Sequence, residues 1–553
     1  MKFICTLFLS FLTIISYSQS AFMKQGANKP IENRSVVAPI IASIGYQGYE
    51  ETQEYFGEGE YEIFIDNVDG ILDNPIIVLD GFDPGDGRDI TGLYNSLSFG
   101  GQNMADILRD EGFDIVILNA PQYTTGGKDI DGGADYIQRN AMVLIELINL
   151  LNTQKVGDEE LVVLGPSMGG LIARYGLAYM EQNSMDAETR LYISFDSPHL
   201  GANIPISLQY LINYLAQELG DADAVAIVDN VLNSPAAKEM LYDHLLGHLL
   251  SGSAYEQDPT LLLPIGAPNF RDAFQAELNT LGFPQNVRNV AMVNGSAQGT
   301  TTGTAGMQVV DTTLDLGSGL TADVILHFTP EAGTTNNATS FDSFFFGIPL
   351  DSFDADAEAF GFSDGVDSAP GGTANISAAL GGGGSTNPVI VAFIAALDQD
   401  DYSFIPVISS LAIENEDDWF ATPDIGGIHS SPFVNTYIPS ENEPHVTVTA
   451  ASAEFALNEI RNPVLGFGDF SIETRYFLAK NPASETIKIQ LNPSFSYGEV
   501  TVEAYSVTGQ NVFSLSEINP KETISIENTL ETGIYFLNIR DAKGVYTLKL
   551  AVQ

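Results

Sequence analysis

The chain contains almost no cysteine. Its 553 residues include one, Cys5, which lies in the apolar segment at the N-terminus. A disulfide needs two cysteines, and a thiol nucleophile or a cysteine-bound metal needs a cysteine in the folded part of the chain. This scarcity excludes disulfide scaffolds, thiol enzymes and cysteine-ligated metal centres.

Basic residues are also scarce. Lysine and arginine number 22 against 72 aspartates and glutamates, which gives a formal net charge of −50 at pH 7. The acidic residues are spread along the chain rather than gathered in one tail. A surface of this charge repels phosphate groups, so nucleic acid and anionic lipid are excluded as partners.

Long hydrophobic runs are confined to the N-terminus. Residues 1–20, MKFICTLFLSFLTIISYSQS, combine Lys2, an apolar run and small residues, as a secretory signal peptide does. No later run approaches the roughly 18 apolar residues of a membrane-spanning helix. We therefore expect cleavage near Ser20, no transmembrane segment, and a secreted protein.

Strands and helices alternate over residues 21–462. PIIVL at 75–79 and FDIVILNA at 113–120 are typical of strands buried on both faces of a parallel sheet. Residues 139–152, RNAMVLIELINLLN, place apolar side chains on one face of a helix. The alternation predicts an α/β domain with a mostly parallel sheet.

Two insertions interrupt this domain. Residues 203–289 have a helical pattern and are predicted to form a helical cap over the active edge of the sheet. Residues 297–386 are rich in Gly, Thr and Asp, which predicts loops and hairpins rather than a separate core. We expect the sheet to resume at 388–397, PVIVAFIAAL, and the domain to end with a helix around 450–461.

A serine stands where a strand gives way to a helix in LVVLGPSMGGLIARYGLAYME, residues 161–181. Four apolar residues precede Gly165, and helical periodicity begins directly after Ser167. Glycines at −2 and +2 remove the β-carbons that would clash in so tight a turn. This context predicts a nucleophile elbow. A second G-x-S-x-G match, around Ser363, has no strand before it.

The segment GPSMGGLIARY at 165–175 resembles the lipase branch of the α/β-hydrolase family, whose elbow reads G-H-S-M-G-G. Pro166 replaces the family's histidine. The resemblance is carried by motifs within about 70–462. It implies that Ser167 is the nucleophile of an acyl transfer, and that an acid and then a histidine follow it in chain order.

The resemblance also implies an oxyanion hole. The first predicted strand ends in IIVLDGFDPGDG, where lipases have H-G. In that family, the amide after this glycine and the amide after the nucleophile stabilise the oxyanion, which assigns the role to the backbone N–H groups of Phe82 and Met168. Asp80 stands in place of the histidine, so only the backbone role is carried over. An ordinary strand-end turn is the alternative.

Two aspartates are candidates for the triad acid. FDSPHLGANIP, residues 195–205, resembles the T-P-H-x-G turn of many lipases, and Asp196 ends the strand before it. Other branches place the acid after a later strand, which makes Asp401 the alternative. A carboxylate at either position would orient the histidine. His199 is interpreted as a structural turn residue.

His445 is the predicted general base. The family order places the histidine after the acid, on a loop near the end of the domain. His445 comes shortly before the helix predicted from about Thr449, as in lipases, whereas His429 follows two glycines and precedes no helix. His429 remains the alternative.

The sequence does not decide whether the protein binds a metal ion. His244 and His248 have a spacing that can bind zinc, but no third ligand is evident, so a pair on a helix surface is the simpler interpretation. Several acids after the first predicted strand could instead bind calcium, although their spacing matches no recognised loop. These acids are Asp80, Asp83, Asp86 and Asp89.

After a linker at 463–475, residues 476–553 alternate with period 2, which predicts a small all-β sandwich. The stretches NPASETIKIQL, VTGQNV and LETGIYFLNIRDAKGVYTLKL resemble the C-terminal sorting domain of type IX secretion cargo. The resemblance implies export by the type IX secretion machinery, with the protein extracellular or attached at the outer cell surface. A carbohydrate-binding or adhesive module is the alternative.

Together these features predict a secreted serine ester hydrolase, a lipase or a carboxylesterase, whose chemistry needs no cofactor. The predicted catalytic triad is Ser167, Asp196 and His445. Its substrate would be an ester or lipid of unspecified chain length. The alternative is a catalytically silent surface protein that keeps the hydrolase scaffold for binding or adhesion.

Overall fold

The computed structural model describes residues 34–380 and 387–461 and most of the tail. In the tail it describes residues 476–552 except 479–482, 484–485, 492–496, 507–509, 519, 522 and 542–543. The chain divides into two compact units, Met1–Pro463 and Val464–Gln553. The expected signal peptide and the expected linker lie outside the described residues.

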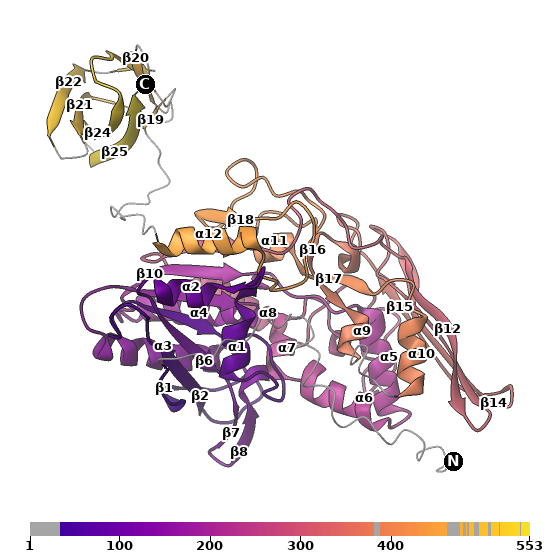
Figure 1. The fold of residues 1–553 in the computed structure, drawn as a ribbon. Coiled ribbons are helices and arrows are strands. Elements are labelled where there is room, and N and C mark those ends of the chain that lie inside the picture. The colour runs from indigo at the N-terminus through magenta and orange to yellow at the C-terminus, as the bar shows by residue number, and fades with distance from the viewer. Residues whose placement is uncertain are drawn as a thin grey trace. The chain divides into compact units, whose positions relative to one another are not determined.

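The larger unit is built on an eight-stranded sheet with the order β1-β2-β6-β3-β9-β10-β11-β18 (Figure 1). All neighbouring pairs from β6 to β18 are parallel, and β2 and β1 extend the sheet in antiparallel fashion. The strands are β1 (Ala38–Tyr46), β2 (Tyr55–Phe64), β3 (Pro75–Leu79), β6 (Asp114–Asn119), β9 (Leu161–Pro166), β10 (Thr189–Phe195), β11 (Arg288–Met292) and β18 (Asn435–Tyr437). This mostly parallel sheet confirms the predicted α/β class.

Helices cover both faces of the sheet, which explains why its strands are continuously apolar. In β3, Ile77 joins the cluster on the α3 and α4 side, whereas Val78 joins the cluster with α1, α2 and α12. Successive strand residues point to opposite faces, so a strand covered on both sides has no polar face. The helices are α1 (Ile90–Ser96), α2 (Met104–Asp110), α3 (Ile137–Gln154), α4 (Met168–Gln182) and α12 (Ala450–Arg461).

The range predicted as a helical cap, 203–289, contains several short helices. They are α5 (Ile206–Gln217), α6 (Ala222–Ile227), α7 (Pro235–Met240) and α8 (Arg271–Leu281). Arg174 of α4 donates hydrogen bonds to the carbonyls of Leu278 and Gly282, at 3.0 and 2.9 Å, where α8 ends. A cation is favoured at a helix C-terminus, so Arg174 fixes the end of α8 against α4. Nowhere in the described part of the chain is there a helix long and apolar enough to cross a membrane.

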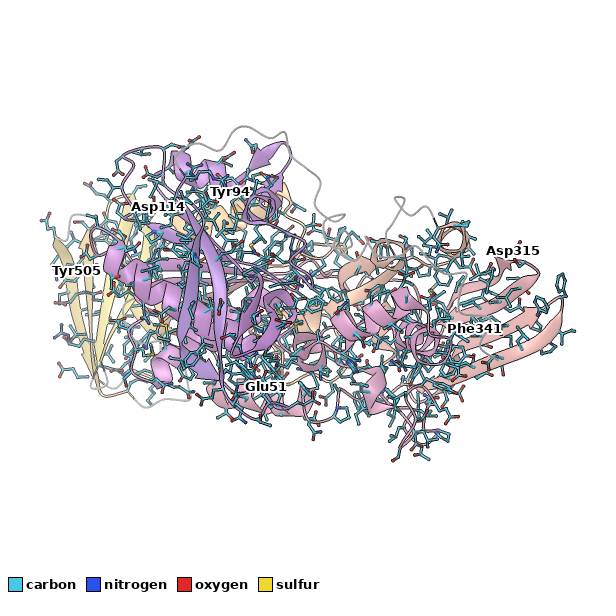
Figure 2. All side chains as sticks on the ribbon, turned by 90° about the horizontal axis from the view of Figure 1, so that it is seen from below. Glu51, Tyr94, Asp114, Asp315, Phe341 and Tyr505 are labelled. Carbon is cyan, nitrogen blue, oxygen red and sulfur yellow. The ribbon has the colours of Figure 1, made fainter. Side chains whose placement is uncertain are left out.

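The segment predicted as loops and hairpins contains a four-stranded antiparallel sheet, residues 308–358, here named the meander. Its strands are β12 (Gln308–Gly317), β13 (Leu320–His327), β14 (Thr335–Phe345) and β15 (Ile348–Glu358). The rings of Phe341 and Phe353 lie 5.3 and 4.7 Å from that of Tyr214 on α5. Figure 2 shows these long strands, with Phe341 and Asp315 labelled. The meander therefore packs on α5 and shares the core of the larger unit.

The segment 388–397 forms a helix, and the prediction of a strand there is wrong. Helix α10 spans Pro388–Ala395, and the Asn387 side chain accepts a hydrogen bond from the Val389 amide at 2.9 Å. A short apolar run fits a buried strand or a buried helix equally well. An N-cap followed by proline at the first helical position decides for the helix. The main sheet ends with β18 instead.

The smaller unit contains two antiparallel sheets, β19-β20-β23 and β22-β21-β24-β25, around a core of their alternate residues. Their strands are β19 (Tyr476–Leu478), β20 (Thr486–Leu491), β21 (Glu499–Ser506), β22 (Asn511–Ile518), β23 (Thr523–Glu527), β24 (Gly533–Asp541) and β25 (Gly544–Val552). Ile487 and Ile489 of β20 are buried, and the residues between and beside them are exposed. The predicted C-terminal all-β sandwich is confirmed.

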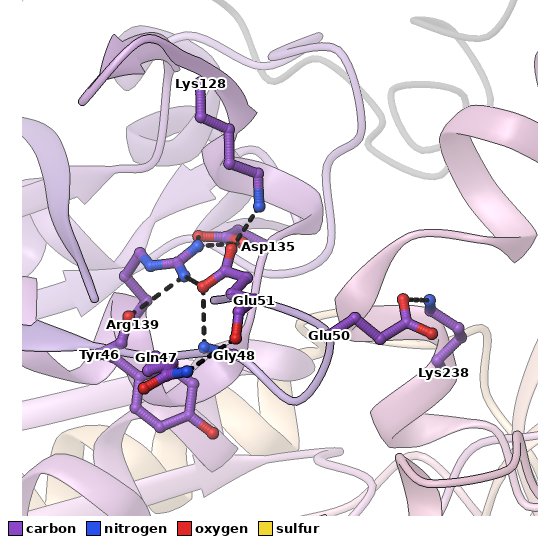
Figure 3. Close-up of polar contacts among 9 residues, drawn as sticks. All are labelled: Tyr46, Gln47, Gly48, Glu50, Glu51, Lys128, Asp135, Arg139 and Lys238. Atoms are coloured by element: carbon purple, nitrogen blue, oxygen red, sulfur yellow. Dashed lines mark hydrogen bonds and ion pairs between the residues drawn. The ribbon is translucent and has the colours of Figure 1, made fainter. Parts of the chain in front are cut away.

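A buried ion network ties the segment between β1 and β2 to α3 (Figure 3). The fully buried Arg139 guanidinium donates to both carboxylate oxygens of Asp135, at 2.8 and 2.7 Å, and also pairs with Glu51. Glu51 pairs in addition with Lys128 and accepts the Gly48 amide. Burial raises the pKa of Asp135 to about 6, although the charge of Arg139 opposes this rise. Arg139 is thus the cation that keeps this buried carboxylate paired.

Replacing Arg139 by methionine should lower the free energy of unfolding by about 3–5 kcal/mol, because Asp135 would lose its buried partner. Arg461→Met is the matched control. Its pair with Glu111 is partly exposed, so the expected loss is below about 1 kcal/mol. Chemical denaturation measures both losses, and equal values would contradict the structural importance of the network.

Candidate active site

Ser167 lies in the turn between β9 and α4 and has a strained backbone, with φ 55° and ψ −129°. The glycines around it leave no room for side chains. A β-carbon on Gly165 would lie 2.4 Å from the Gly169 carbonyl oxygen, and one on Gly169 would lie 2.7 Å from the Asp80 carbonyl oxygen. One on Gly170 would reach within 1.9 Å of a neighbouring serine hydroxyl. The sequence pattern thus reflects a turn that only glycine permits at these positions.

A hydrogen-bond chain joins Ser167, His445 and Asp196. His445 Nε2 lies 2.9 Å from Ser167 Oγ, and His445 Nδ1 lies 2.7 Å from Asp196 Oδ2. Because a carboxylate only accepts, the Nδ1–H donates to Asp196, which leaves Nε2 to accept from the serine hydroxyl. This is the geometry of a nucleophile, its base and the group that orients the base.

Asp196 is fully buried and held from several sides. It follows β10 with a positive φ of 47°, and its Oδ1 accepts from the Asn294 amide at 3.1 Å and the Ser410 hydroxyl at 3.3 Å. Gly372 lies so close that a β-carbon there would be 2.0 Å from Asp196 Oδ2. These contacts leave the carboxylate one orientation, the one that faces His445.

Two paired strands lie beside this site, one within the second insertion and one after it. Gly372 lies on β16 (Gly371–Asn375), which pairs with β17 (Asp401–Pro406). From β17, the Phe404 ring meets the His445 ring edge-on, with centroids 4.9 Å apart. Gly372, Phe404, Ser410 and Asn294 belong to no motif from which the sequence predicts the site. The one local signal was the glycine pair Gly371–Gly372, which begins β16.

The turn after β3 lies beside the nucleophile. A β-carbon on Gly81 would be 3.1 Å from that of Ser167, and Phe82 is the next residue in this turn. Met168 is the first residue of α4, where the backbone N–H has no acceptor within the helix. Backbone N–H groups without an acceptor in the protein are the kind of donor that an oxyanion needs.

An ion pair holds this turn. Arg88 Nη2 donates to Asp80 Oδ1 at 2.6 Å and to the Phe82 carbonyl at 3.2 Å, while its backbone N–H donates to Asp83 at 2.7 Å. The Gly81 amide also donates to Asp80 Oδ1. Burial raises the pKa of Asp80 to about 7, and the Arg88 charge opposes this rise. Asp80, in the place of the family's histidine, thus braces the backbone that carries the Phe82 amide.

The alternative triad residues make other contacts. Asp401 bonds to Asn375 at the far end of β17, and His429 Nε2 lies 3.2 Å from Glu416. Ser363 accepts the Trp419 amide and donates to a neighbouring carbonyl. The Ser363 motif is thus part of a loop-anchoring contact.

The histidine pair expected on a helix surface is buried instead. Only a 3₁₀ turn, Leu245–Gly247, separates the two residues. His248 Nε2 lies 2.6 Å from Asp243, and His244 Nε2 lies 2.8 Å from the Leu232 carbonyl. The prediction of a surface pair is wrong because the segment closes onto the core rather than forming a helix. His199 is also buried, with Nε2 2.8 Å from the Ser194 hydroxyl.

The four acids considered for calcium bond to protein groups. Asp86 accepts from Asn119 at 3.0 Å, and Asp89 caps α1 by accepting the Gly92 amide at 2.7 Å. Asp80 and Asp83 bond to Arg88 as described. Among the described residues, no cluster of histidine, cysteine, aspartate or glutamate side chains has a geometry that could hold a metal ion.

Together, the fold and the site define a class. A serine in a strained strand–helix turn, an aspartate after the adjacent strand and a histidine later in the chain meet at the carboxyl ends of β9 and β10. This order, on a mostly parallel sheet covered by helices, is that of the α/β-hydrolase fold.

The family comparisons agree with both resemblances seen in the sequence. Residues 123–221, which include Ser167 and Asp196, match the family described as "Putative serine esterase (DUF676)". Residues 481–553 match the family described as "Secretion system C-terminal sorting domain". Each of these two segments is therefore similar to the family that its match names, and the matches cover residues 123–221 and 481–553 only.

Solved structures with similar parts include Est1E from Butyrivibrio proteoclasticus, 11% identical over 43% of this chain and 74% of that chain, with a TM-score of 0.22. A Pyrobaculum calidifontis esterase is 14% identical over 50% of this chain and 78% of that chain, with a TM-score of 0.23. Dimeric latent PorU from Porphyromonas gingivalis is 23% identical over 14% of this chain but only 9% of its own length, with a TM-score of 0.12. A comparison with curated proteins gave no match.

Gly372→Ala should lower kcat about 100-fold, because the new methyl group would displace the Asp196 carboxylate and a misplacement of about 1 Å costs that much. Gly361→Ala is the matched control, since a β-carbon there meets no atom within 4 Å. Ester hydrolysis and circular dichroism of both variants test this. Full activity in Gly372→Ala would show that the carboxylate's fixed orientation is unimportant.

Proposed function

We propose that the protein is a secreted serine ester hydrolase that works through an acyl-enzyme on Ser167. The observation that carries the proposal is the hydrogen-bond chain from Ser167 through His445 to Asp196. The contact between His445 and Asp196 supports Asp196, rather than Asp401, as the triad acid. Phe82 and Met168 are the proposed oxyanion donors.

In the proposed reaction, His445 Nε2 takes the hydroxyl proton while Ser167 Oγ attacks the acyl carbonyl carbon. Asp196 stabilises the resulting imidazolium and keeps its Nδ1 proton in place. The two backbone amides stabilise the oxyanion of the tetrahedral intermediate. His445 then returns its proton to the leaving alcohol, and water, activated in the same way, releases the acid and restores the serine.

The substrate is proposed as a carboxylic ester, and both the lipase and the carboxylesterase type fit the site. Ser167 and His445 are 8% and 9% exposed, so an ester would have to reach a largely enclosed nucleophile. Rates on a series of dissolved esters of increasing acyl length would separate the two types. The alternative is a catalytically silent protein that keeps the hydrolase scaffold for binding, and the labelling experiment below distinguishes it from an enzyme.

Ser167→Ala and His445→Ala should each lower kcat by about 10⁴-fold or more, because the triad acts as a unit. A fluorophosphonate probe should label the wild type rapidly, the His445 variant slowly and the Ser167 variant not at all. His429→Ala is the control and should label at the wild-type rate. A wild type that resists the probe would favour the silent scaffold, and rapid labelling of His445→Ala would remove His445 from its proposed role.

Deleting residues 476–553 should block export of the chain and leave the purified enzyme active. The tail has a hydrophobic core of its own, distinct from the cores that flank the main sheet. Its match to a sorting domain supports recognition by the type IX secretion machinery, with release or surface attachment afterwards. Cell fractionation measures the first effect and ester hydrolysis the second. A soluble but inactive truncation would make the tail part of the catalytic unit.

A further inference from the structure

The turn between β14 and β15 presents a compact apolar surface to solvent. Residues 345–350, FFGIPL, are here named the hairpin tip. Phe346 is 74% exposed, Ile348 65%, and Phe345 and Leu350 nearly half. The tip ends the long meander seen in Figures 1 and 2, away from the main sheet. Single exposed apolar residues are ordinary, but several that adjoin one another mark an interaction surface.

The backbone of the tip displays an aromatic side chain at a position that disfavours it. Phe345 pairs with Ile348, so Phe346 and Gly347 form a two-residue turn, and their φ angles are 47° and 77°. Turns with two positive φ angles favour Asn-Gly. The Phe346 amide donates to the Gly319 carbonyl at 2.7 Å, and a β-carbon on Gly319 would strike the Phe346 ring. The neighbouring turn therefore supports this exposed phenylalanine.

The rest of the meander separates the tip from other apolar surfaces. Its inner face packs on α5 through Phe341 and Phe353. Its outer face carries aspartates that alternate with these buried residues, among them Asp323, Asp342 and Asp354. No lysine or arginine occurs between Arg288 and Arg461. The hairpin tip is thus apolar and uncharged, and the charged residues of the meander below it are all acidic.

We propose that the hairpin tip docks the enzyme on the surface of a neutral ester lipid, such as a triacylglycerol droplet. The inference rests on the proposed function and extends it from ester hydrolysis to esters in an insoluble phase. A convex tip whose backbone hydrogen bonds are already made can enter a fluid apolar phase without a matching cavity. Apolar side chains supply the attraction, and no cation is needed because neutral lipid carries no charge.

Other occupants fit the tip less well. An anionic membrane attracts basic residues, and this region of the chain has none. A second copy of the chain would have to bury enough area for a stable dimer. Four side chains of roughly 200 Å² each, about half exposed, offer roughly 400 Å² per tip. Two tips together stay below the ~1,200 Å² of a specific interface.

The test measures flotation of the chain with triolein droplets. Ser167→Ala serves as the parent, so that hydrolysis does not alter the droplet surface. Adding Phe346→Asn and Ile348→Thr should lower the partition coefficient by about tenfold or more, because apolar area is lost. The melting temperature should not fall, because Asn-Gly suits the turn and threonine suits a strand. Val156→Asn, at a site 61% exposed on the loop after α3, is the matched control and should partition like the parent.

In the active chain, the tip substitutions should lower the rate on emulsified triacylglycerol and leave the rate on a dissolved short-chain ester unchanged. Unchanged flotation of the tip variant would overturn the inference. Stronger binding to anionic vesicles than to triolein would overturn it too, as would a tip-dependent dimer in sedimentation. A chain that hydrolyses dissolved esters but ignores droplets would refute the docking surface alone. A chain that floats but hydrolyses no ester would refute the proposed function alone.

Discussion

The hydrogen bond between Asp196 Oδ2 and His445 Nδ1 joins residues 249 positions apart, and the larger unit is organised around it. Between the two residues the chain forms the helical range, the meander, β16, β17 and the last strand of the main sheet. All of these must return the chain to one point at the carboxyl edge of β10. The proposed chemistry therefore depends on long-range packing, even though the nucleophile itself sits in a local turn.

The second insertion takes part in that packing. Gly372, on β16 of this insertion, lies against the Asp196 carboxylate. After the insertion, Phe404 on β17 lies against the His445 ring, and the Ser410 hydroxyl donates to Asp196. On the other side of the nucleophile, Asp80 and Arg88 brace the turn that carries the Phe82 amide. The site is thus supported from two sides, by the turn after β3 of the main sheet and by the paired strands β16 and β17.

The elbow at Ser167 could be predicted from local signals, because glycines, a strand and a helix surround the serine. Asp196 and His445 were predicted through the resemblance to lipases, which implies the chain order of nucleophile, acid and histidine. Gly372 and Phe404 could not be predicted, because their importance comes from how a distant hairpin packs. The apolar run at 388–397 was predicted as a strand but forms helix α10, because hydrophobicity alone does not distinguish a buried helix from a buried strand. The alternation of the meander was obscured by its many Gly, Thr and Asp residues.

The packing of the meander on α5 stops short of its outer end, as the burial of Phe353 and the exposure of Ile348 show. Substitutions, insertions or deletions beyond that point change no residue that the Ser167 turn or the Asp196 carboxylate contacts. The outer end of the hairpin and the catalytic edge of the sheet can therefore accumulate substitutions at different rates. A lineage can remodel the outer end of the hairpin, or an engineer can graft another sequence there, while the catalytic edge of the sheet stays the same.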